Sequence, residues 1–342
     1  MDYVELHQDA VVIDMHNDAI AAHICRGRLS LARGEEGAES RHQGMGAFLQ
    51  PYEKPMAGAD FIQINFPIMR QAGIDAAFFA VDVTPAIKSW LTFALDVFGY
   101  LFDDIAQSRA DVTIVRRADD ILEAKANGRP ALILAVENAD CTEGRLNVLR
   151  ALYELGVRSI GLTHNVSSCA ADGCLEARPG VGLTHFGVQL VQEMNRIGML
   201  VDLAHVSESA FYSALEVTSK PVVFSHGNAR ALCDHPRNLT DAQLKALAAN
   251  GGVIGLSCVP MFIDKEKPSL ERFLDHVDHI ADIAGIDVIG LGGDFDGGGT
   301  LLASAVEVPR ITEGLLKRGY SDADVRQILG GNSFRVLKEA IG

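Results

Sequence analysis

The chain has 342 residues, of which 48% are hydrophobic and 22% charged, and this composition excludes an intrinsically disordered protein. Its formal net charge of −15 repels phosphate backbones and anionic lipids, so we expect neither nucleic acid nor a membrane as a partner. No apolar stretch reaches the roughly 18 residues of a spanning helix, and no signal peptide is visible. Six cysteines scattered over so long a chain do not form a disulfide framework, and we therefore expect a cytoplasmic protein.

Eight short apolar runs predict the strands of a parallel sheet. Each run is nearly continuously apolar and rich in β-branched residues, which is typical of strands buried on both faces. In chain order, the predicted strands are residues 10–15, 76–83, 131–136, 159–162, 200–204, 221–224, 252–258 and 287–292. Amphipathic stretches of helical length separate most of them, and the clearest are residues 144–156, 184–198 and 240–250.

The alternation of eight strands with helices favours a closed (β/α)8 barrel, or TIM barrel, over an open doubly wound sheet. The sequence shows no linker and no internal repeat, so we expect one α/β domain over residues 1–342. Two long insertions, residues 24–75 and 165–184, each follow the carboxyl end of a predicted strand. Both are therefore expected to overhang the mouth of the barrel and to shape a substrate pocket.

Five residues with metal-binding side chains lie at the polar ends of predicted strands. They are His16, Asp18, Glu137, His205 and His226. A parallel barrel gathers the carboxyl ends of its strands at one mouth, so these distant residues are expected to converge. Each has an ordinary alternative when taken alone, such as a core histidine, a turn aspartate or a glutamate paired with an arginine. Their shared position favours a metal site.

Five nitrogen and oxygen ligands are too many for one tetrahedral zinc ion and suit two metal ions. We expect His16 and Asp18 on one ion, because residues two apart in an extended chain face the same way. The second ion would be held by His205 and His226, with Glu137 as the bridge. Ligands without thiolate favour zinc, although manganese, cobalt and iron also fit. A hydroxide bridging two such ions is a nucleophile for acyl or phosphoryl centres.

Two more polar residues follow predicted strands. Asp294 lies in the segment IGLGGDFDGGG, where its carboxylate could take a proton from the attacking water and pass it to a leaving amine. The alternatives are a structural turn or a phosphate-binding glycine loop over residues 290–299, although two aspartates would repel a phosphate. His164 closes the run SIGLT, and it either polarises a substrate carbonyl or is an ordinary core histidine.

The polar segment HGNARALCDHPRN, which begins at His226, contains Arg230, His235 and Arg237. A guanidinium at the mouth could bind a substrate carboxylate through two parallel hydrogen bonds. Each of these three residues is equally well explained as a surface charge.

Other histidines carry weaker signals. His276 and His279 lie on an acidic amphipathic stretch and are expected to be solvated. His23 and His42 accompany the first insertion, where a role in the pocket stays open.

Seven segments of the chain resemble the membrane (renal) dipeptidase family, the dinuclear zinc dipeptidases of metallopeptidase type M19. The segments are VIDMHND, LAVENAD, GVRSIGLTHN, GLTHFGVQLVQEMNRIGMLVDLAHVS, VVFSHGNARALCDHPRNLTD, IGLGGDFDG and GGNSFRVL. They span almost the whole chain, and several are long and irregular, so the resemblance is specific. It points to the bacterial, soluble branch because secretion and anchoring signals are absent.

The resemblance implies a (β/α)8 barrel, a homodimer and two zinc ions per subunit. It also implies dipeptide substrates, often with a D-residue at the C-terminal position, and β-lactams for some members. For the metal ligands, it implies the same five residues in the same pairing as the strand ends indicate.

The resemblance also implies roles for three residues around the metal ions. His164 would contact the substrate and the tetrahedral intermediate, and Arg237 would receive the C-terminal carboxylate of the dipeptide. Asp294 would be the proton shuttle.

Three rival functions fit parts of the same pattern. The first is another metal-dependent amidohydrolase acting on a cyclic amide, lactone or β-lactam, although no lysine lies at a predicted strand end to bridge its metals. The second is a phosphate-binding lyase or isomerase that uses the glycine loop at residues 290–299. The third is a degenerate barrel retained as a binding protein, but a decayed site would have lost some of its ligands.

Overall fold

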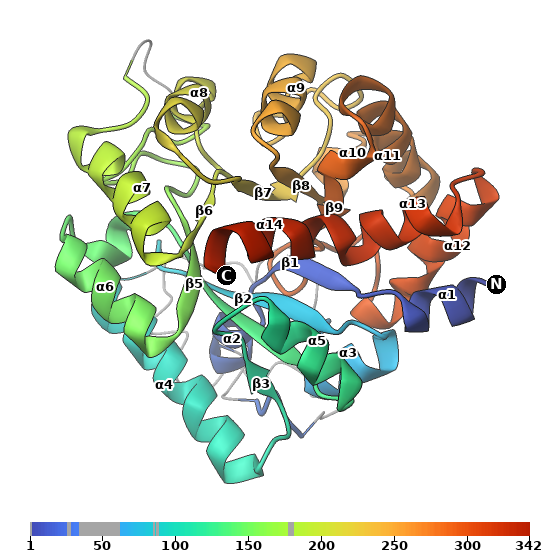
Figure 1. The fold of residues 1–342 in the computed structure, drawn as a ribbon, viewed down its shortest axis with the longest axis horizontal. Helices are drawn as coiled ribbons and strands as arrows, with labels where there is room; N and C mark the ends of the chain where they lie inside the picture. The colour runs from blue at the N-terminus through green and yellow to red at the C-terminus, as the bar shows by residue number, and fades with distance from the viewer. Residues whose placement is uncertain (1, 26–28, 34–61, 85, 87–88, 177–180) are drawn as a thin grey trace.

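The computed structural model describes residues 2–25, 29–33, 62–84, 86, 89–176 and 181–342 (Figure 1). The strands are β1 (Ile13–Asn17), β2 (Ala76–Asp82), β3 (Thr113–Ile114), β4 (Ala131–Glu137), β5 (Val157–Gly161), β6 (Leu200–Asp202), β7 (Val223–Gly227), β8 (Val253–Leu256) and β9 (Ile289–Leu291). The helices are α1 (Tyr3–Asp9), α2 (Ala19–Cys25), α3 (Phe66–Ala72), α4 (Trp90–Ser108), α5 (Asp119–Ala126), α6 (Leu146–Leu155), α7 (His185–Ile197), α8 (Glu208–Val217), α9 (Asp241–Ala249), α10 (Pro260–Ile263), α11 (Leu270–Ala284), α12 (Pro309–Lys317), α13 (Asp322–Arg326) and α14 (Asn332–Ile341).

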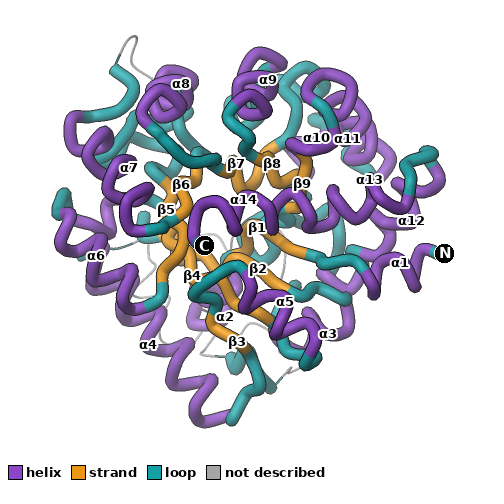
Figure 2. The backbone as a smooth tube through the Cα atoms, in the orientation of Figure 1, coloured by secondary structure: helices purple, strands orange, loops and turns teal. Residues whose placement is uncertain are grey.

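The strands close into a parallel barrel. The sheet runs β2-β1-β9-β8-β7-β6-β5-β4-β3, and an additional parallel pairing of β2 with β4 joins its two sides. Eight strands form the ring, while β3 pairs only with β4 at its outer edge. Helices surround the ring in Figures 1 and 2. The predicted (β/α)8 barrel is therefore confirmed, and the short strand β3, which has only partly buried residues, is an addition that the apolar pattern did not indicate.

The helices begin and end where local chemistry requires it. The Thr240 side chain accepts a hydrogen bond from the Gln243 backbone, and the Gln243 side chain returns to the Thr240 backbone, which makes a capping box for α9. The Thr184 side chain caps α7 in the same position, and Gly198 ends that helix in the left-handed region. The predicted helices at 184–198 and 240–250 are confirmed to within a residue or two.

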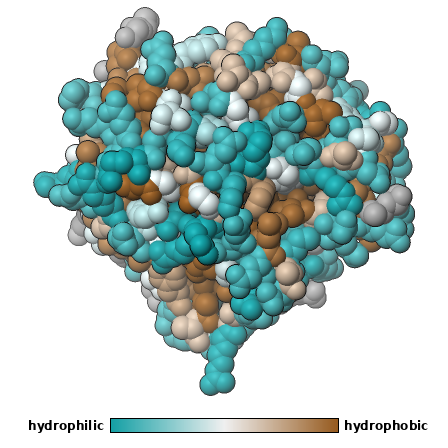
Figure 3. All heavy atoms as spheres, viewed as in Figure 1, coloured by the Kyte–Doolittle hydropathy of each residue, from teal (hydrophilic) through white to brown (hydrophobic). Residues whose placement is uncertain are grey.

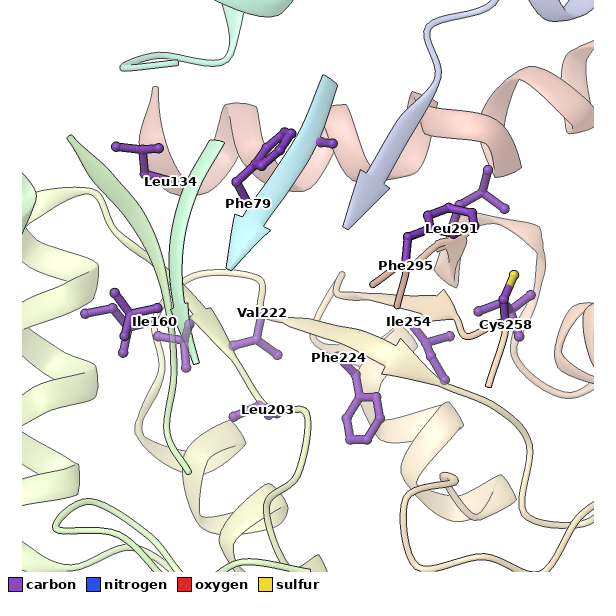
Figure 4. Packing of buried hydrophobic residues seen from close by; sticks show 14 of the residues in the cluster. Phe79, Leu134, Ile160, Leu203, Val222, Phe224, Ile254, Cys258, Leu291 and Phe295 are labelled. Carbon is purple, nitrogen blue, oxygen red and sulfur yellow. The ribbon is translucent and has the colours of Figure 1, made fainter. Parts of the chain in front are cut away.

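Buried apolar residues form one layer inside the barrel and a larger layer outside it. On β2, Phe78 and Ala80 belong to the inner layer, and Phe79 and Val81 to the outer one. Figure 4 shows part of the outer layer, packed between the strands and the helices. Because side chains alternate along a strand, the next residue, Asp82, faces the inside of the barrel.

Helix α14 closes the amino-terminal end of the barrel. Val336 and Leu337 pack into the inner apolar layer, and Asn332 Nδ2 donates a hydrogen bond of 2.9 Å to the carbonyl of Ile289, where β9 begins. Figure 1 shows α14 lying across the strands, and Figure 3 shows that the surface on this side is mostly hydrophilic with scattered apolar residues. The carboxyl ends of the strands therefore form the mouth of the barrel at its other end.

Both insertions contact this mouth where the structure describes them. Asp296, which follows β9, accepts backbone hydrogen bonds from Gln63 and Ile64 at the end of the first insertion. In the second insertion, the backbone amide of Cys174 donates to the carbonyl of His205 at 2.7 Å. Among the described residues, no helix has the length and apolar character needed to cross a membrane.

Candidate active site

The mouth of the barrel brings together all five predicted metal ligands. His16 and His226 lie on β1 and β7, and Glu137 is the last residue of β4. Asp18 directly follows β1, and His205 follows β6 by three residues. Each of the five is buried, with at most 7% of its surface exposed. The positional prediction is therefore confirmed as a geometric cluster.

His16 lies among three carboxylates. Its Nε2 atom is 3.7 Å from Asp18 Oδ2, 3.9 Å from Glu137 Oε2 and 3.9 Å from Asp294 Oδ1. Its ring also stacks on that of His226 at a centroid distance of 3.8 Å. These three distances from His16 Nε2 are too long for direct hydrogen bonds.

His205 and His226 lie near the other carboxylate oxygen of Glu137. Glu137 Oε1 lies 2.7 Å from His205 Nε2 and 3.6 Å from His226 Nε2, and the two nitrogens are 2.8 Å apart. Glu137 thus presents Oε2 to His16 and Oε1 to His205 and His226. The alternative in which Glu137 pairs with an arginine is wrong, since its close neighbours among the described residues are histidines.

The donor atoms of this cluster fit a metal centre. Among the described residues, His16 Nε2 and Asp18 Oδ1 are buried without a hydrogen-bond partner. Buried polar atoms without partners are costly, and a bound cation satisfies them. Three overlapping groups have ligand atoms within 4.8 Å of one another: His16 with Glu137 and His226, Glu137 with His164 and His205, and His16 with Asp18 and Asp294. Glu137 and His16 each belong to two of these groups, so the groups form one continuous cluster.

Burial dominates the electrostatics of the cluster. It raises the pKa of Glu137 well above the usual range and that of Asp294 to about 6. Burial lowers the pKa values of His205 and His226, with neighbouring positive charges adding to the shift, so both imidazoles are neutral. Burial also opposes the charge of His16, but the nearby carboxylates outweigh it and raise the pKa to about 10. A divalent cation would stabilise these carboxylates in their ionised form.

The backbone at the site adopts unusual conformations. His205, Asp294 and Asn138, which follows Glu137, have φ values of 69°, 56° and 80°. Non-glycine residues rarely occupy this left-handed region, and such residues concentrate at functional sites. The loop after β9 is also tied to β1, because the Asp294 amide donates to the carbonyl of His16 at 3.0 Å.

Arg237 is a buried cation with unused hydrogen-bond donors. Only 3% of its surface is exposed, and its guanidinium lies 5.6 Å from the ring centre of Phe224 and 5.4 Å from that of Phe262. Nη2 donates to the carbonyl of His226 at 2.9 Å. Among the described residues, Nε and Nη1 have no hydrogen-bond partner. These free N–H groups are available to an anionic group such as a carboxylate.

The other candidate residues take different positions. The ring of His164 stacks on that of His205 at 4.3 Å, so His164 borders the cluster. Arg230 pairs with Asp234 at 3.2 Å on the surface, which leaves Arg237 as the arginine at the site. The ring of His235 packs against Phe262 at 4.6 Å.

The expectation that His276 is solvated is wrong. His276 is fully buried: its Nε2 bonds to the carbonyl of Ile263 at 2.9 Å, and its Nδ1 accepts from the amide of Ala229 at 3.1 Å. His279 is partly buried and pairs with Asp241 at 2.8 Å. His276 lies three residues after the buried Phe273, so its place on the apolar face of α11 was readable from the sequence.

Of the two histidines that accompany the first insertion, the structure describes His23. His23 is buried at the end of α2, with its Nδ1 3.3 Å from the carbonyl of Leu29. His42 lies outside the described residues.

The hydrogen bonds within residues 290–299 contradict the interpretation of this glycine-rich segment as a phosphate-binding loop. The amides of Gly297 and Gly299 both donate to the carbonyl of Asp294, and the amide of Gly293 donates to Asp14 Oδ1. The amide of Asp296 donates to Gln63 Oε1. These N–H groups are used within the protein, so they cannot surround a phosphate.

Sequence reasoning missed four residues that contact or face the cluster. They are Asp82, Asn165, Ser225 and Gly297. Asp82 is paired in register with Glu137 and is the next-to-last residue of a predicted strand, so the same strand-end argument could have found it. Ser225 directly precedes His226 on β7, whereas Asn165 and Gly297 act through contacts that depend on loop conformation, for which the sequence carries no pattern.

Gly297 leaves room for two carboxylates. A Cβ atom at this position would overlap Asp18 Oδ2 and Asp294 Oδ1. We therefore expect Gly297→Ala to displace both side chains and to lower metal content and catalytic activity by about 10-fold or more, on the scale seen when a residue that orients a ligand is changed. The measurement is metal content by mass spectrometry together with kcat/KM. Gly99→Ala is the matched control, because Gly99 lies in α4 with open space around it, and it should leave both quantities unchanged.

Comparison with known sequences gives fungal relatives. The chain is 38% identical to Dipeptidase verJ of Clonostachys rogersoniana over 229 residues, which are 66% of this chain and 59% of that protein. It is 32% identical to an uncharacterized dipeptidase of Schizosaccharomyces pombe over 351 residues, covering 98% of this chain and 82% of the relative. The chain thus spans less than two thirds of the length of Dipeptidase verJ.

Comparison with solved structures gives whole-chain similarity. A metallopeptidase from Rhodobacter sphaeroides, bound to a phosphinate mimic of the dipeptide L-Ala-D-Ala, is 25% identical with a TM-score of 0.80 and covers 97% of this chain and 100% of its own. A metallopeptidase named dipeptidase AC, of family M19, is 26% identical with a TM-score of 0.80, and the match covers 97% of this chain and 99% of that one. The family model described as membrane dipeptidase (peptidase family M19) matches residues 2–341. Together with the barrel and its cluster of metal-binding residues, this match shows that the chain belongs to the membrane dipeptidase family of metallopeptidases, which are peptide hydrolases.

Proposed function

We propose that this protein is a dinuclear zinc dipeptidase, which hydrolyses the single peptide bond of dipeptides, including those with a D-residue at the C-terminal position. The observation that carries the proposal is the buried Arg237 guanidinium with two free N–H groups, at the same mouth as the metal-binding cluster. Metal-binding residues alone indicate a hydrolase of any substrate class. A buried cation beside them adds a requirement for an anionic group on the substrate.

In this proposal, two zinc ions occupy the cluster. His16 and Asp18 would hold one ion, His205 and His226 the other, and Glu137 would bridge them, in keeping with its Oε2 atom near His16 and its Oε1 atom near His205. Bound zinc ions would supply Lewis acidity, which polarises the scissile carbonyl and activates a water molecule for attack. The imidazoles of His205 and His226 are neutral, which is the form that binds metal, whereas His16 would lose its proton when an ion binds.

The remaining mouth residues would orient the substrate and move a proton. Arg237 would bind the C-terminal carboxylate through its free N–H groups, so that only a peptide ending one residue beyond the scissile bond fits. His164 would donate a hydrogen bond to the carbonyl oxygen as negative charge develops on it. Asp294, whose pKa is raised to about 6, would accept a proton at its carboxylate and pass it to the leaving amine.

A panel of blocked and unblocked dipeptides tests this function. We expect hydrolysis of L-Ala-L-Ala and L-Ala-D-Ala, its loss on treatment with a chelator, and a strong reduction when the C-terminus is amidated. Removing one partner of a buried charge pair, here the substrate carboxylate beside Arg237, costs about 2–5 kcal/mol of binding free energy. Amidation should therefore lower kcat/KM by about 30-fold or more.

Cyclic amides, lactones and a β-lactam complete the same panel. Turnover of these compounds without turnover of any dipeptide would favour the other metal-dependent amidohydrolases and would refute the dipeptidase proposal. The homodimer and the cytoplasmic location stay predictions, and sedimentation of the purified protein tests the first of them.

A further inference from the structure

Asn165 holds the imidazole of His205 from the side opposite the cluster. Its Oδ1 atom lies 2.9 Å from His205 Nδ1, while His205 Nε2 points toward Glu137 Oε1 at 2.7 Å. An amide oxygen only accepts hydrogen bonds, so in a ring whose Nε2 binds a metal ion the hydrogen is on Nδ1, where Asn165 accepts it. The lone pair of His205 Nε2 is then directed into the cluster.

His226 lacks an equivalent restraint. Its Nδ1 atom lies 2.8 Å from the hydroxyl of Ser225, which can either donate or accept a hydrogen bond. This partner is compatible with both neutral forms of the ring. Of these two histidines, His205 is therefore the one whose hydrogen position its partner fixes.

The second insertion fixes Asn165 itself. The carbonyl of Asn165 accepts from the amide of Leu175 at 2.9 Å, and the amide of Cys174 donates to the carbonyl of His205 at 2.7 Å. Gly173 pairs with Val206 in an antiparallel bridge between these two contacts. A Cβ atom on Gly173 would overlap the carbonyl of Asn165, so this close approach requires a glycine.

These contacts connect the loop to the backbone of His205, which has a left-handed φ of 69°. From them we infer that Asn165 is a positioning residue for metal binding at His205. We also infer that the first part of the second insertion, residues 165–176, holds the Asn165 side chain in place. The inference rests on the proposed metal site, and it adds a residue that binds neither metal nor substrate. Partners of metal-binding histidines typically change metal affinity by about 10- to 100-fold when they are removed.

Zinc titrations of three variants test the role of Asn165. In Asn165→Leu, which keeps the size of the side chain but removes the acceptor, we expect one of two zinc equivalents to bind about 10- to 100-fold more weakly in competition with a chelator. Asn165→Asp keeps an acceptor and should restore binding. Asn332→Leu is the matched control, because Asn332 is a buried asparagine at the other end of the barrel. It should lower the melting temperature and leave both zinc equivalents unchanged.

A second variant and a spectroscopic readout make the test independent of folding losses. Gly173→Ala displaces the Asn165 carbonyl without removing the amide, and it should weaken the same zinc equivalent. In the zinc-loaded wild-type protein, long-range ¹H–¹⁵N spectra of labelled histidines should show the hydrogen of His205 on Nδ1. Unchanged zinc affinity in Asn165→Leu, or an equal loss in Asn332→Leu, would overturn the inference. A wild-type protein that binds no zinc would overturn the proposed metal site itself.

Discussion

Replacing Glu137 with glutamine is expected to lower kcat/KM for dipeptides by at least about 1,000-fold and to remove bound zinc. Glutamine has nearly the same shape, but it lacks the charge that would balance two cations held by His16, His205 and His226. A loss of about 4 kcal/mol of transition-state stabilisation corresponds to this factor. Steady-state kinetics and metal content, measured on the same preparation, test the prediction.

Glu193→Gln is the matched control for this substitution. Glu193 lies on α7, where it pairs with Arg150 and Arg196 at 2.6 and 2.7 Å, remote from the mouth of the barrel. Its loss should leave kcat/KM and zinc content unchanged. A Glu137→Gln protein that retained two zinc ions and wild-type activity would show that Glu137 does not bridge metal ions.

Arg237→Met is expected to lower kcat/KM for dipeptides with a free C-terminus by about 30-fold or more, mostly through KM. Methionine keeps the apolar contact with Phe224 and Phe262 but removes the hydrogen-bond donors. Removing one partner of a buried, hydrogen-bonded charge pair costs about 2–5 kcal/mol. The ratio of kcat/KM between free and C-amidated dipeptides should therefore fall toward unity.

The control for Arg237→Met is Arg230→Met in the same loop. Arg230 pairs with Asp234 on the surface, so its replacement should not change the preference for a free carboxylate. If Arg237→Met kept the full discrimination between the free and the amidated substrate, another group would have to bind the carboxylate.

The sequence predicted the fold and the membership of the cluster well, because both follow from short-range patterns. Nearly continuous apolar runs indicate strands buried on both faces, and the residue at the end of such a run lies at the mouth of a parallel barrel. His16, Glu137 and His226 were found in this way without any knowledge of tertiary contacts. The same rule applied to Asp82 would have added one more carboxylate.

The remaining features depend on contacts between distant segments. Asn165 and His205 are forty residues apart in sequence, and their hydrogen bond exists only because the second insertion returns to β6. Gly297 matters because its backbone passes close to Asp18 and Asp294, which no local pattern reveals. For Arg237, sequence spacing left Arg230 as an equal candidate, and the difference in burial between them separates the two.

The most direct test of a metal-dependent dipeptidase is to remove the metal and restore it. Zinc content and L-Ala-L-Ala hydrolysis would be measured on one preparation before chelation, after chelation, and during stepwise addition of zinc. We predict that activity is lost with the metal and returns as zinc binds, reaching its full value at two equivalents per chain. Full activity in the metal-free protein, or no hydrolysis at any zinc occupancy, would contradict the proposed function.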